Sequence, residues 1–232
     1  MRILGIIPAR GGSKGIPRKN IKILGGQPLL KYTWDVASKS KYLTTVILST
    51  EDDEIIEVGT SLGISIPFKR PTSLSEDTST SLDVIKHALN FYDEKGAPFD
   101  AICLLQVTSP FRTVSFLDNA IKKFIDTKSD ALVSVLEVPH EYNPHWTFEE
   151  DSNKQLRIST GDKKIITRRQ DLPKTYHRDG SIYLTKASVI LNQNSLFGNS
   201  LSYILSNKST HVNIDTMEDW NKAELICKNN VL

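Results

Sequence analysis

Three observations predict an α/β protein built on a doubly wound, mostly parallel β-sheet. Short apolar runs alternate with longer amphipathic stretches as far as Val138. The runs are apolar throughout rather than at every second position, which is typical of parallel strands covered by helices on both faces. Polar segments follow three of these runs, where the strand ends of such a sheet form a ligand crevice.

The expected elements follow one another in order along the chain. Strands are expected at the apolar runs 2–8, 44–50, 64–68, 101–107 and 131–138. Helices are expected at the amphipathic stretches 29–38, 52–62, 81–92 and 114–126. A strand at 181–185 resumes the core pattern, and a last helix runs from about Met217 to Lys228, with Thr216 or Asp215 near its N-cap.

The alternation stops after Val138. Residues from about 139 to 180 carry Pro, Asn and aromatic residues without a long helical period. A structureless loop of that length would be unusual in a compact domain. We therefore expect a single domain over residues 1–232, with an inserted lobe of short strands and turns at about 139–180.

The composition argues against several classes of protein. The 232 residues carry a formal net charge of +2, which is too small for a general nucleic-acid binder. No run reaches the roughly 18 apolar residues that span a bilayer, so we expect no membrane partner and a cytoplasmic location. Cys103 and Cys227 are isolated, which predicts packing residues rather than a disulfide framework or a metal site.

The segment "IIPARGGSKGIPRKN" after the first strand predicts a site for a multiply charged anion. Its glycine spacing fits neither the P-loop nor the dinucleotide-binding template. Adjacent Gly11 and Gly12 allow backbone N–H groups to converge on an oxyanion, and Arg10, Lys14 and Lys19 can offset several phosphate charges. A triphosphate fits this loop better than the alternative, a surface turn with solvated cations.

Six segments, taken in order, closely resemble the acylneuraminate cytidylyltransferases: "IIPARGGSKGIPRKN", "RPTSLSEDTSTS", "LLQVTSPFR", "RRQDLP", "RDGSIYLT" and "VNIDT". These enzymes use CTP to activate nine-carbon acidic sugars such as N-acetylneuraminate or legionaminate for cell-surface polysaccharide biosynthesis. The resemblance implies a Rossmann-like fold, Mg²⁺ as cofactor, and a homodimer in which a dimerisation lobe reaches toward the other subunit's site. Enzymes that activate the eight-carbon acid Kdo are the alternative family, and a catalytically silent nucleotide-binding regulator is the alternative class.

The resemblance also implies roles in nucleotide binding for single residues. Arg10 and Lys19 match the pair that binds the triphosphate and stabilises the pyrophosphate leaving group, with Lys14 and Asn20 in support. The residues that match the cytidine-contacting segment are Arg70, Ser79 and Ser81. The alternative for Arg70 is a surface arginine before a proline turn.

Sugar recognition is implied for three residues. Gln106 matches a glutamine beside the sugar acid, whereas Ser109 and Arg112 are expected to serve the turn that follows it. Arg168 and Arg169 lie in the lobe, and one of them is expected to pair with the sugar carboxylate, because a planar guanidinium suits that group. The alternative is a solvated charge pair on a hairpin.

Asp215 is the expected ligand for Mg²⁺ and, with Arg10 and Lys19, completes the expected catalytic set. A single carboxylate, together with phosphate oxygens and water, suffices for this ion. Asn213 stands where many relatives carry the first aspartate of a D-x-D pair, so a neutral oxygen replaces a carboxylate. The competing role for Asp215 is the N-cap of the last helix. No pattern of serine, histidine and aspartate predicts a covalent intermediate, and the general base is not identified.

Overall fold

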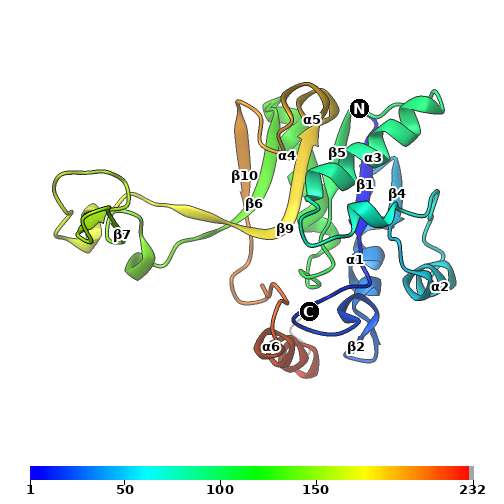
Figure 1. Cartoon of the computed structure of the whole chain (residues 1–232), viewed down its shortest axis with the longest axis horizontal. Coiled ribbons are helices and arrows are strands. Elements are labelled where there is room, and N and C mark those ends of the chain that lie inside the picture. The colour runs from blue at the N-terminus through cyan, green and yellow to red at the C-terminus, as the bar shows by residue number, and fades with distance from the viewer. Residues whose placement is uncertain (230–232) are drawn as a thin grey trace.

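The structure, a computed structural model, describes residues 1–229 and is built on a six-stranded β-sheet (Figure 1). The strand order is β10-β6-β9-β5-β1-β4. In chain order the strands are β1 (Ile3–Pro8), β4 (Thr45–Ser49), β5 (Ala101–Leu104), β6 (Ala131–Glu137), β9 (Tyr176–Lys186) and β10 (Leu201–Leu205). All run in one direction except β9, which pairs antiparallel with β5 and β6. The predicted mostly parallel sheet is confirmed.

Helices cover both faces of this sheet, as a doubly wound fold requires. One core takes side chains from α1 (Leu29–Ala37), α2 (Asp53–Ser61), α4 (Val114–Thr127) and α6 (Met217–Lys228), and the other from α3 (Ser81–Glu94) and α5 (Ala187–Gln193). Alternate residues of β1 enter the two cores, with Ile3 and Ile7 in the first and Leu4 and Ile6 in the second. Each is fully buried and contributes roughly 1.5–3 kcal/mol by leaving water.

Threonine side chains cap the N-termini of three of the helices. Thr80, Thr113 and Thr216 each accept a hydrogen bond from a backbone N–H in the first turn, at the starts of α3, α4 and α6. Such a cap stabilises a helix by about 1 kcal/mol. At α6, Thr216 forms a capping box with Asp219. Asp215 is therefore not the cap, and its carboxylate is available for another purpose.

The structure also departs from the expected elements in places. Residues 64–68 form only an isolated bridge between Ser65 and Ile47 of β4, and Pro67 in this run has no N–H to donate to a ladder. The sequence interpretation missed α5 and β10, as well as a short hairpin of β2 (Ile23–Leu24) and β3 (Gln27–Pro28). In β10 the exposed and half-buried residues alternate, so it lacks the continuous apolar run that identified the other strands.

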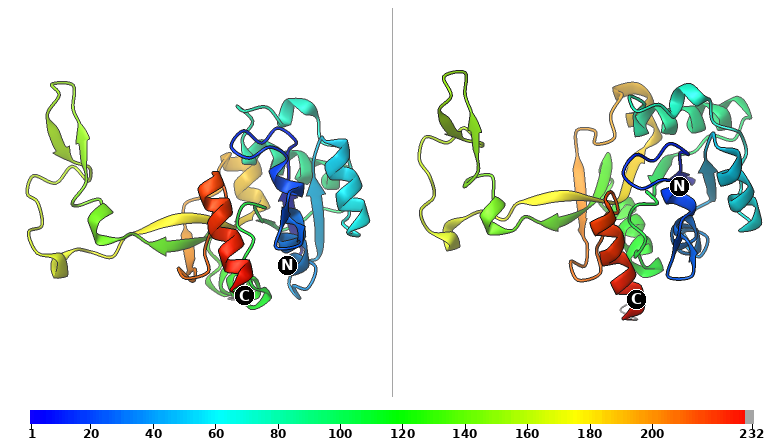
Figure 2. Two further views of the ribbon diagram at one scale, coloured as in Figure 1. Left: turned by 90° about the horizontal axis from the view of Figure 1, so that it is seen from below. Right: turned by 60° about the horizontal axis from the view of Figure 1, so that its bottom comes forward.

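Residues 139–175 leave the sheet and project far from the rest of the molecule (Figures 1 and 2). This lobe contains the antiparallel hairpin of β7 (Phe148–Glu150) and β8 (Leu156–Ile158) and two 3-10 turns, at His140–Tyr142 and Arg169–Asp171. Short strands and turns were expected here. Residues 176–180, at the end of the expected lobe, already belong to β9, which carries the chain back into the sheet.

The order of the strands determines where a ligand can bind. From β1 the chain first forms β4 on one side and later β5 on the other, so the carboxyl ends of β1 and β5 diverge at a topological switch point.

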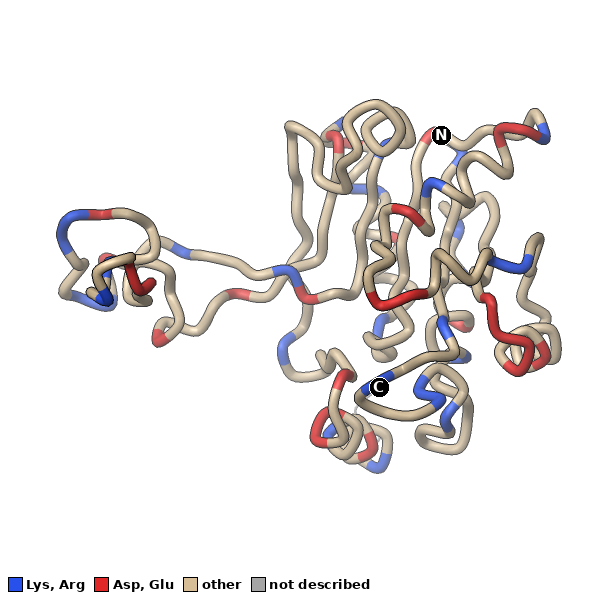
Figure 3. Tube along the Cα trace, viewed as in Figure 1, with Lys and Arg blue, Asp and Glu red and all other residues tan. Residues whose placement is uncertain are grey.

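Basic and acidic residues are interspersed over both the body and the lobe (Figure 3). Within residues 1–229, none of the helices has both the length and the apolar character needed to cross a bilayer.

Candidate active site

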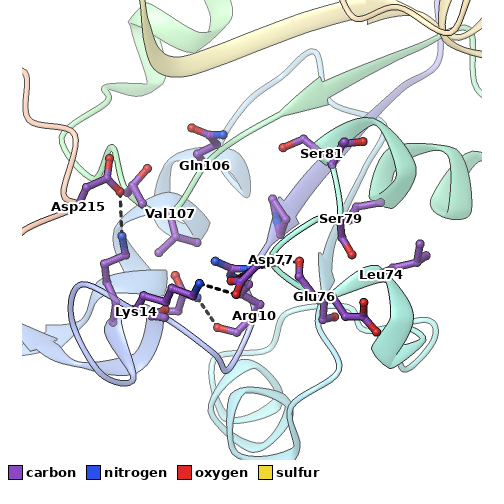
Figure 4. Close-up of a pocket in the computed structure, with 18 of the residues that line it drawn as sticks. Arg10, Lys14, Leu74, Glu76, Asp77, Ser79, Ser81, Gln106, Val107 and Asp215 are labelled. Atoms are coloured by element: carbon purple, nitrogen blue, oxygen red, sulfur yellow. Dashed lines mark hydrogen bonds and ion pairs between the residues drawn. The ribbon is translucent and has the colours of Figure 1, made fainter.

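A cavity of about 540 Å³ lies at this switch point (Figure 4). Four segments that are distant in the sequence line it: residues 8–20 after β1, 70–84 before and within α3, 106–108 after β5, and 213–215 before α6. Nine of the eleven residues predicted for the site lie in its wall, namely Arg10, Lys14, Lys19, Asn20, Arg70, Ser79, Ser81, Gln106 and Asp215. The fold therefore brings together most of what the sequence interpretation had selected separately.

Two cations of the opening loop meet an acidic residue inside this cavity (Figure 4). Lys14 Nζ lies 2.5 Å from Asp77 Oδ2, and Arg10 Nη1 lies 3.2 Å from Asp77 Oδ1. The hydrogen bond from Lys14 is the main reason that the pKa of Asp77 lies below its ordinary value. All three side chains are substantially exposed, so these pairs are weak and a more highly charged anion can replace Asp77.

Lys19 connects the opening loop with the segment before α6. Its Nζ donates to the carbonyl oxygen of Ile214 at 2.6 Å and lies 3.1 Å from Asp215 Oδ1. The side chain is only 12% exposed, so Lys19 is not a solvated cation of a surface turn, which was the alternative for this loop. Asn213 Nδ2 donates to the other oxygen, Asp215 Oδ2, at 2.6 Å. Asp215 is thereby held in place while most of its side chain stays open to solvent.

The donors around Asp215 determine what kind of metal site is possible. Among residues 1–229, no three His, Cys, Asp or Glu side chains are grouped closely enough to hold a metal ion. Asn213 Oδ1 is buried and has no hydrogen-bond partner. One carboxylate and a neutral amide fit a hard cation such as Mg²⁺ only if phosphate oxygens and water complete its coordination.

Two N–H groups of the opening loop are already bound within the protein. The N–H of Gly11 is donated to Glu51 Oε1 at 2.8 Å, and the N–H of Ser13 is donated to the carbonyl of Gly11 at 3.0 Å. The glycines instead permit close packing, because a Cβ on Gly11 would lie 2.2 Å from Asp52 Oδ2 and one on Gly15 would lie 2.2 Å from the carbonyl oxygen of Asp215.

Asn20 and Arg70 line the cavity but are already bound within the protein. Asn20 is buried and donates from Nδ2 to the carbonyl oxygen of Arg10 at 2.9 Å, which fixes the loop beside that arginine. Arg70 is 4% exposed, and its guanidinium binds Glu51 and Ser75. The alternative of a surface arginine is therefore wrong.

Gln106 follows β5 and enters the cavity from the sheet side (Figure 4). Arg112 fixes the turn behind it, donating from Nη2 to the carbonyl oxygen of Gln106 and from Nε to that of Ser181 at 2.8 Å. Burial lowers the pKa of Arg112 to about 10, so it remains a cation at neutral pH. Gly180 has φ +82°, and a Cβ there would lie 3.2 Å from Gln106 Oε1. The absence of a side chain at Gly180 thus leaves room for the Gln106 side chain.

Arg168 and Arg169 do not reach this cavity within one chain. They lie in the projecting lobe, where Arg168 Nε donates to Asp171 Oδ2 at 2.7 Å. Arg169 lines a separate cavity of about 600 Å³ at the base of the lobe, together with His140 and Leu172. The arrangement in one chain therefore leaves the cavity without the two arginines assigned to the sugar carboxylate.

Sequence reasoning missed the acidic residues that organise the site. Asp77 stands in a segment already selected for its serines, and Glu51 falls between the expected strand at 44–50 and the expected helix at 52–62 and was not selected. The available signal was the run of four acidic residues at 51–54 directly after an apolar strand, on the same side of the sheet as a cation-rich loop.

Comparison with known proteins identifies related enzymes. A family model described as cytidylyltransferase matches residues 4–230. Pseudaminic acid cytidylyltransferase of Campylobacter jejuni is 35% identical over 230 residues, which cover 99% of this chain and 98% of that protein. CMP-N,N'-diacetyllegionaminic acid synthase of Legionella pneumophila is 32% identical over 233 residues, with 99% and 98% covered.

Solved structures agree on the fold. A CMP-2-keto-3-deoxy-manno-octonic acid synthetase in complex with CTP gives a TM-score of 0.73, with 99% of this chain and 100% of that chain covered. The two sequences are 14% identical, so this likeness concerns the fold alone. Given the family match over nearly the whole length and relatives above 30% identity, the chain belongs to the cytidylyltransferase family of nucleotidyltransferases.

Proposed function

We propose that the protein transfers CMP from CTP to a nine-carbon acidic sugar and releases pyrophosphate. The observation that carries this proposal is the single cavity in which Arg10, Lys14 and Lys19 lie with Gln106 and Asp215. Three cations suit a triphosphate, and a carboxylate beside them suits the cation that accompanies it. The names of the relatives, which activate pseudaminic and legionaminic acids, support the choice of sugar.

The reaction consists of attack by the anomeric hydroxyl of the sugar on the α-phosphorus of CTP. A new oxygen–phosphorus bond forms, and the bond to the bridging oxygen of the leaving pyrophosphate breaks. In our proposal Arg10 and Lys19, with Lys14, bind the triphosphate and stabilise the charge that develops on pyrophosphate. Arg70, Ser79 and Ser81 hold cytidine, and Asn20 keeps the loop in shape through Arg10. Gln106 orients the sugar, so positioning provides much of the rate acceleration.

We propose Mg²⁺ as the divalent cation of this reaction, held by Asp215. When bound, Mg²⁺ neutralises phosphate charge during phosphoryl transfer. Asn213 donates to Asp215 and so keeps one carboxylate oxygen at a fixed place. Lys19, bound to the other oxygen, keeps this carboxylate next to the triphosphate loop.

We further propose a homodimer in which the lobe of one subunit completes the cavity of the other, with Arg168 or Arg169 binding the sugar carboxylate. Support comes from exposed apolar side chains, since Tyr142 and Leu156 in the lobe are 70% and 69% exposed. The edge strand β10 presents a second group of exposed apolar side chains, Leu201, Tyr203 and Leu205. Exposed apolar surface of this kind is typical of interfaces.

The test is an assay of pyrophosphate release from CTP, run with pseudaminic, legionaminic and N-acetylneuraminic acids and with Kdo. We expect turnover with at least one nine-carbon acid and little with Kdo. Preference for Kdo would identify the alternative family, and binding of CTP without turnover of any acid would identify a silent regulator. Because CTP is supplied in the cytoplasm, we place the reaction there.

A further inference from the structure

Two acidic residues at the end of β4 hold the opening loop from behind. Glu51 and Asp52 follow the strand closely, and neither lines the cavity. Glu51 Oε1 accepts the backbone N–H of Gly11 at 2.8 Å. Asp52 binds the guanidinium of Arg18 with both oxygens, at 2.6 and 2.8 Å. The stretch between these two points, which carries Lys14 and is flanked by Arg10 and Lys19, is therefore fastened at both ends.

Glu51 also binds the second segment of the nucleotide site. Its other oxygen, Oε2, accepts hydrogen bonds from Arg70 Nη2 at 2.7 Å and from Ser75 Oγ at 2.8 Å. Arg70 Nε donates to the same Ser75 Oγ at 2.9 Å, which closes a small network. Arg70 and Ser75 both line the cavity. One carboxylate thus joins the loop assigned to the triphosphate to the segment assigned to cytidine.

These contacts are strong because the groups are charged and protected from water. The side chains of Glu51 and Arg70 are 14% and 3% exposed. Burial raises the pKa of Glu51, but the hydrogen bonds that it accepts, chiefly from Gly11 and Arg70, outweigh burial and keep the pKa below its ordinary value. The hydrogen bond from Arg18 lowers the pKa of Asp52 in a similar way. Both carboxylates are ionised at neutral pH and form charge-assisted hydrogen bonds.

The third acid of the same run is directed elsewhere. Asp53 is 79% exposed and binds Lys69 at 2.5 Å. No hydrogen bond or ion pair joins it to the opening loop, although its neighbours in the chain, Asp52 and Glu54, both bind Arg18. The role of the first two acids therefore follows from their geometry rather than from the acidity of the run.

We propose that Glu51 and Asp52 are positioning residues for the nucleotide. They hold the triphosphate loop and, through Glu51, the cytidine segment in one geometry before CTP binds. The inference rests on the proposed function, because it assigns both segments to CTP. A preorganised site binds its ligand without the cost of ordering a loop, so loss of this clamp weakens CTP binding and leaves the sugar site unchanged.

The experiment compares the KM values for CTP and for the sugar acid in three variants that each remove one charge from the run. Glu51→Gln keeps the size of the side chain but replaces one carboxylate oxygen with an NH₂ group, which cannot accept the hydrogen bonds that Glu51 accepts. We therefore expect the KM for CTP to rise about tenfold or more. Asp52→Asn is milder because asparagine also caps α2, and we expect a rise of roughly two- to fivefold. Asp53→Asn is the matched control, with both KM values unchanged.

The two KM values separate positioning from a general loss of structure. Loss of folded protein lowers the apparent kcat and moves neither KM, whereas the proposal requires the KM for CTP to rise while that for the sugar stays within about twofold. Equal changes in both KM values, or an unchanged KM for CTP, overturn the inference and leave the proposed function standing. If Glu51→Gln does not fold, Asp52→Asn decides. If the unmodified protein is inactive with every sugar acid, both the inference and the proposed function are wrong.

Discussion

The nucleotide cavity and the projecting lobe differ in how much of their organisation a single chain provides. In the cavity, contacts between distant segments fix the functional side chains, as when Lys19 binds Ile214 and Asp215. In the lobe the arginine assigned to the sugar has a neighbouring partner, since Arg168 binds Asp171 three positions along the chain. Contacts between distant segments hold the cavity in its geometry before a ligand arrives, whereas the arginines of the lobe need another surface to become part of a site.

Lys19→Ala tests the organised region and has the largest expected effect. Removal of this cation takes away a group that we assign to the leaving pyrophosphate, so we expect kcat with CTP to fall roughly a hundredfold. Because Lys19 also holds Ile214 and Asp215, a small loss of stability accompanies it. Lys122→Ala, which removes an exposed cation of α4, is the control and should keep parental turnover. Turnover of Lys19→Ala within threefold of the parent contradicts the phosphate role.

Subunit mixing tests the lobe. An Arg168→Ala/Arg169→Ala double variant and Lys19→Ala should each be nearly inactive, and their mixture should regain up to about a quarter of the parental activity under conditions of subunit exchange. Random pairing makes half of the dimers mixed, and each mixed dimer has one site without a lesion. Pyrophosphate release measures the recovery. If the heterodimers are as inactive as the two variants by themselves, the lobe serves the site of its own subunit.

Asp215→Asn tests the junction between the loop and the segment before α6. Loss of the carboxylate weakens the site for the divalent cation, so we expect about tenfold more Mg²⁺ to be needed for half-maximal rate. CTP binding measured without metal should change little. Glu218→Gln, an exposed acid in the first turn of α6, is the control. An identical Mg²⁺ titration in Asp215→Asn and the parent rules out the ligand role and leaves the carboxylate as the partner of Lys19.

The difference between the two regions also explains what the sequence could predict. Strands that are apolar throughout identified the sheet, and polar residues after β1 and β5 had to meet because parallel strands end at one edge. Glu51 was missed because its partners, Gly11 and Arg70, lie 40 and 19 positions away, and only the packed structure pairs them. The sequence also left open a surface position for Arg70, which the structure excludes. An arginine is buried only where a partner is available, and the composition does not reveal that partner.

A pH series tests whether Glu51 stabilises the fold as well as the site. Its pKa in the folded protein lies below the ordinary value near 4.5, so its contribution to stability is present above that pH and is lost as the pH falls through the lower, folded-state pKa. At pH 7, Glu51→Gln should lower the Tm by roughly 5–10 °C, because Arg70 is left buried without its carboxylate. The difference in Tm should narrow below about pH 4.5. If the difference in Tm between Glu51→Gln and the parent does not depend on pH, the ionised carboxylate is not the source of the stability.

Asp77→Asn has the smallest expected effect and tests whether the cavity holds an internal substitute for phosphate. Asp77 pairs with Lys14 and Arg10, so the triphosphate must displace it before those cations can bind CTP. Removing its charge should lower the KM for CTP roughly two- to threefold, as expected for exposed ion pairs, and the gain should vanish at high salt. Pyrophosphate should inhibit the variant more strongly for the same reason. Glu76→Gln is the neighbouring control, because Glu76 contacts Arg10 through its backbone carbonyl. A rise in the KM for CTP would instead show that Asp77 assists binding, as an additional acidic ligand of the metal–nucleotide complex does.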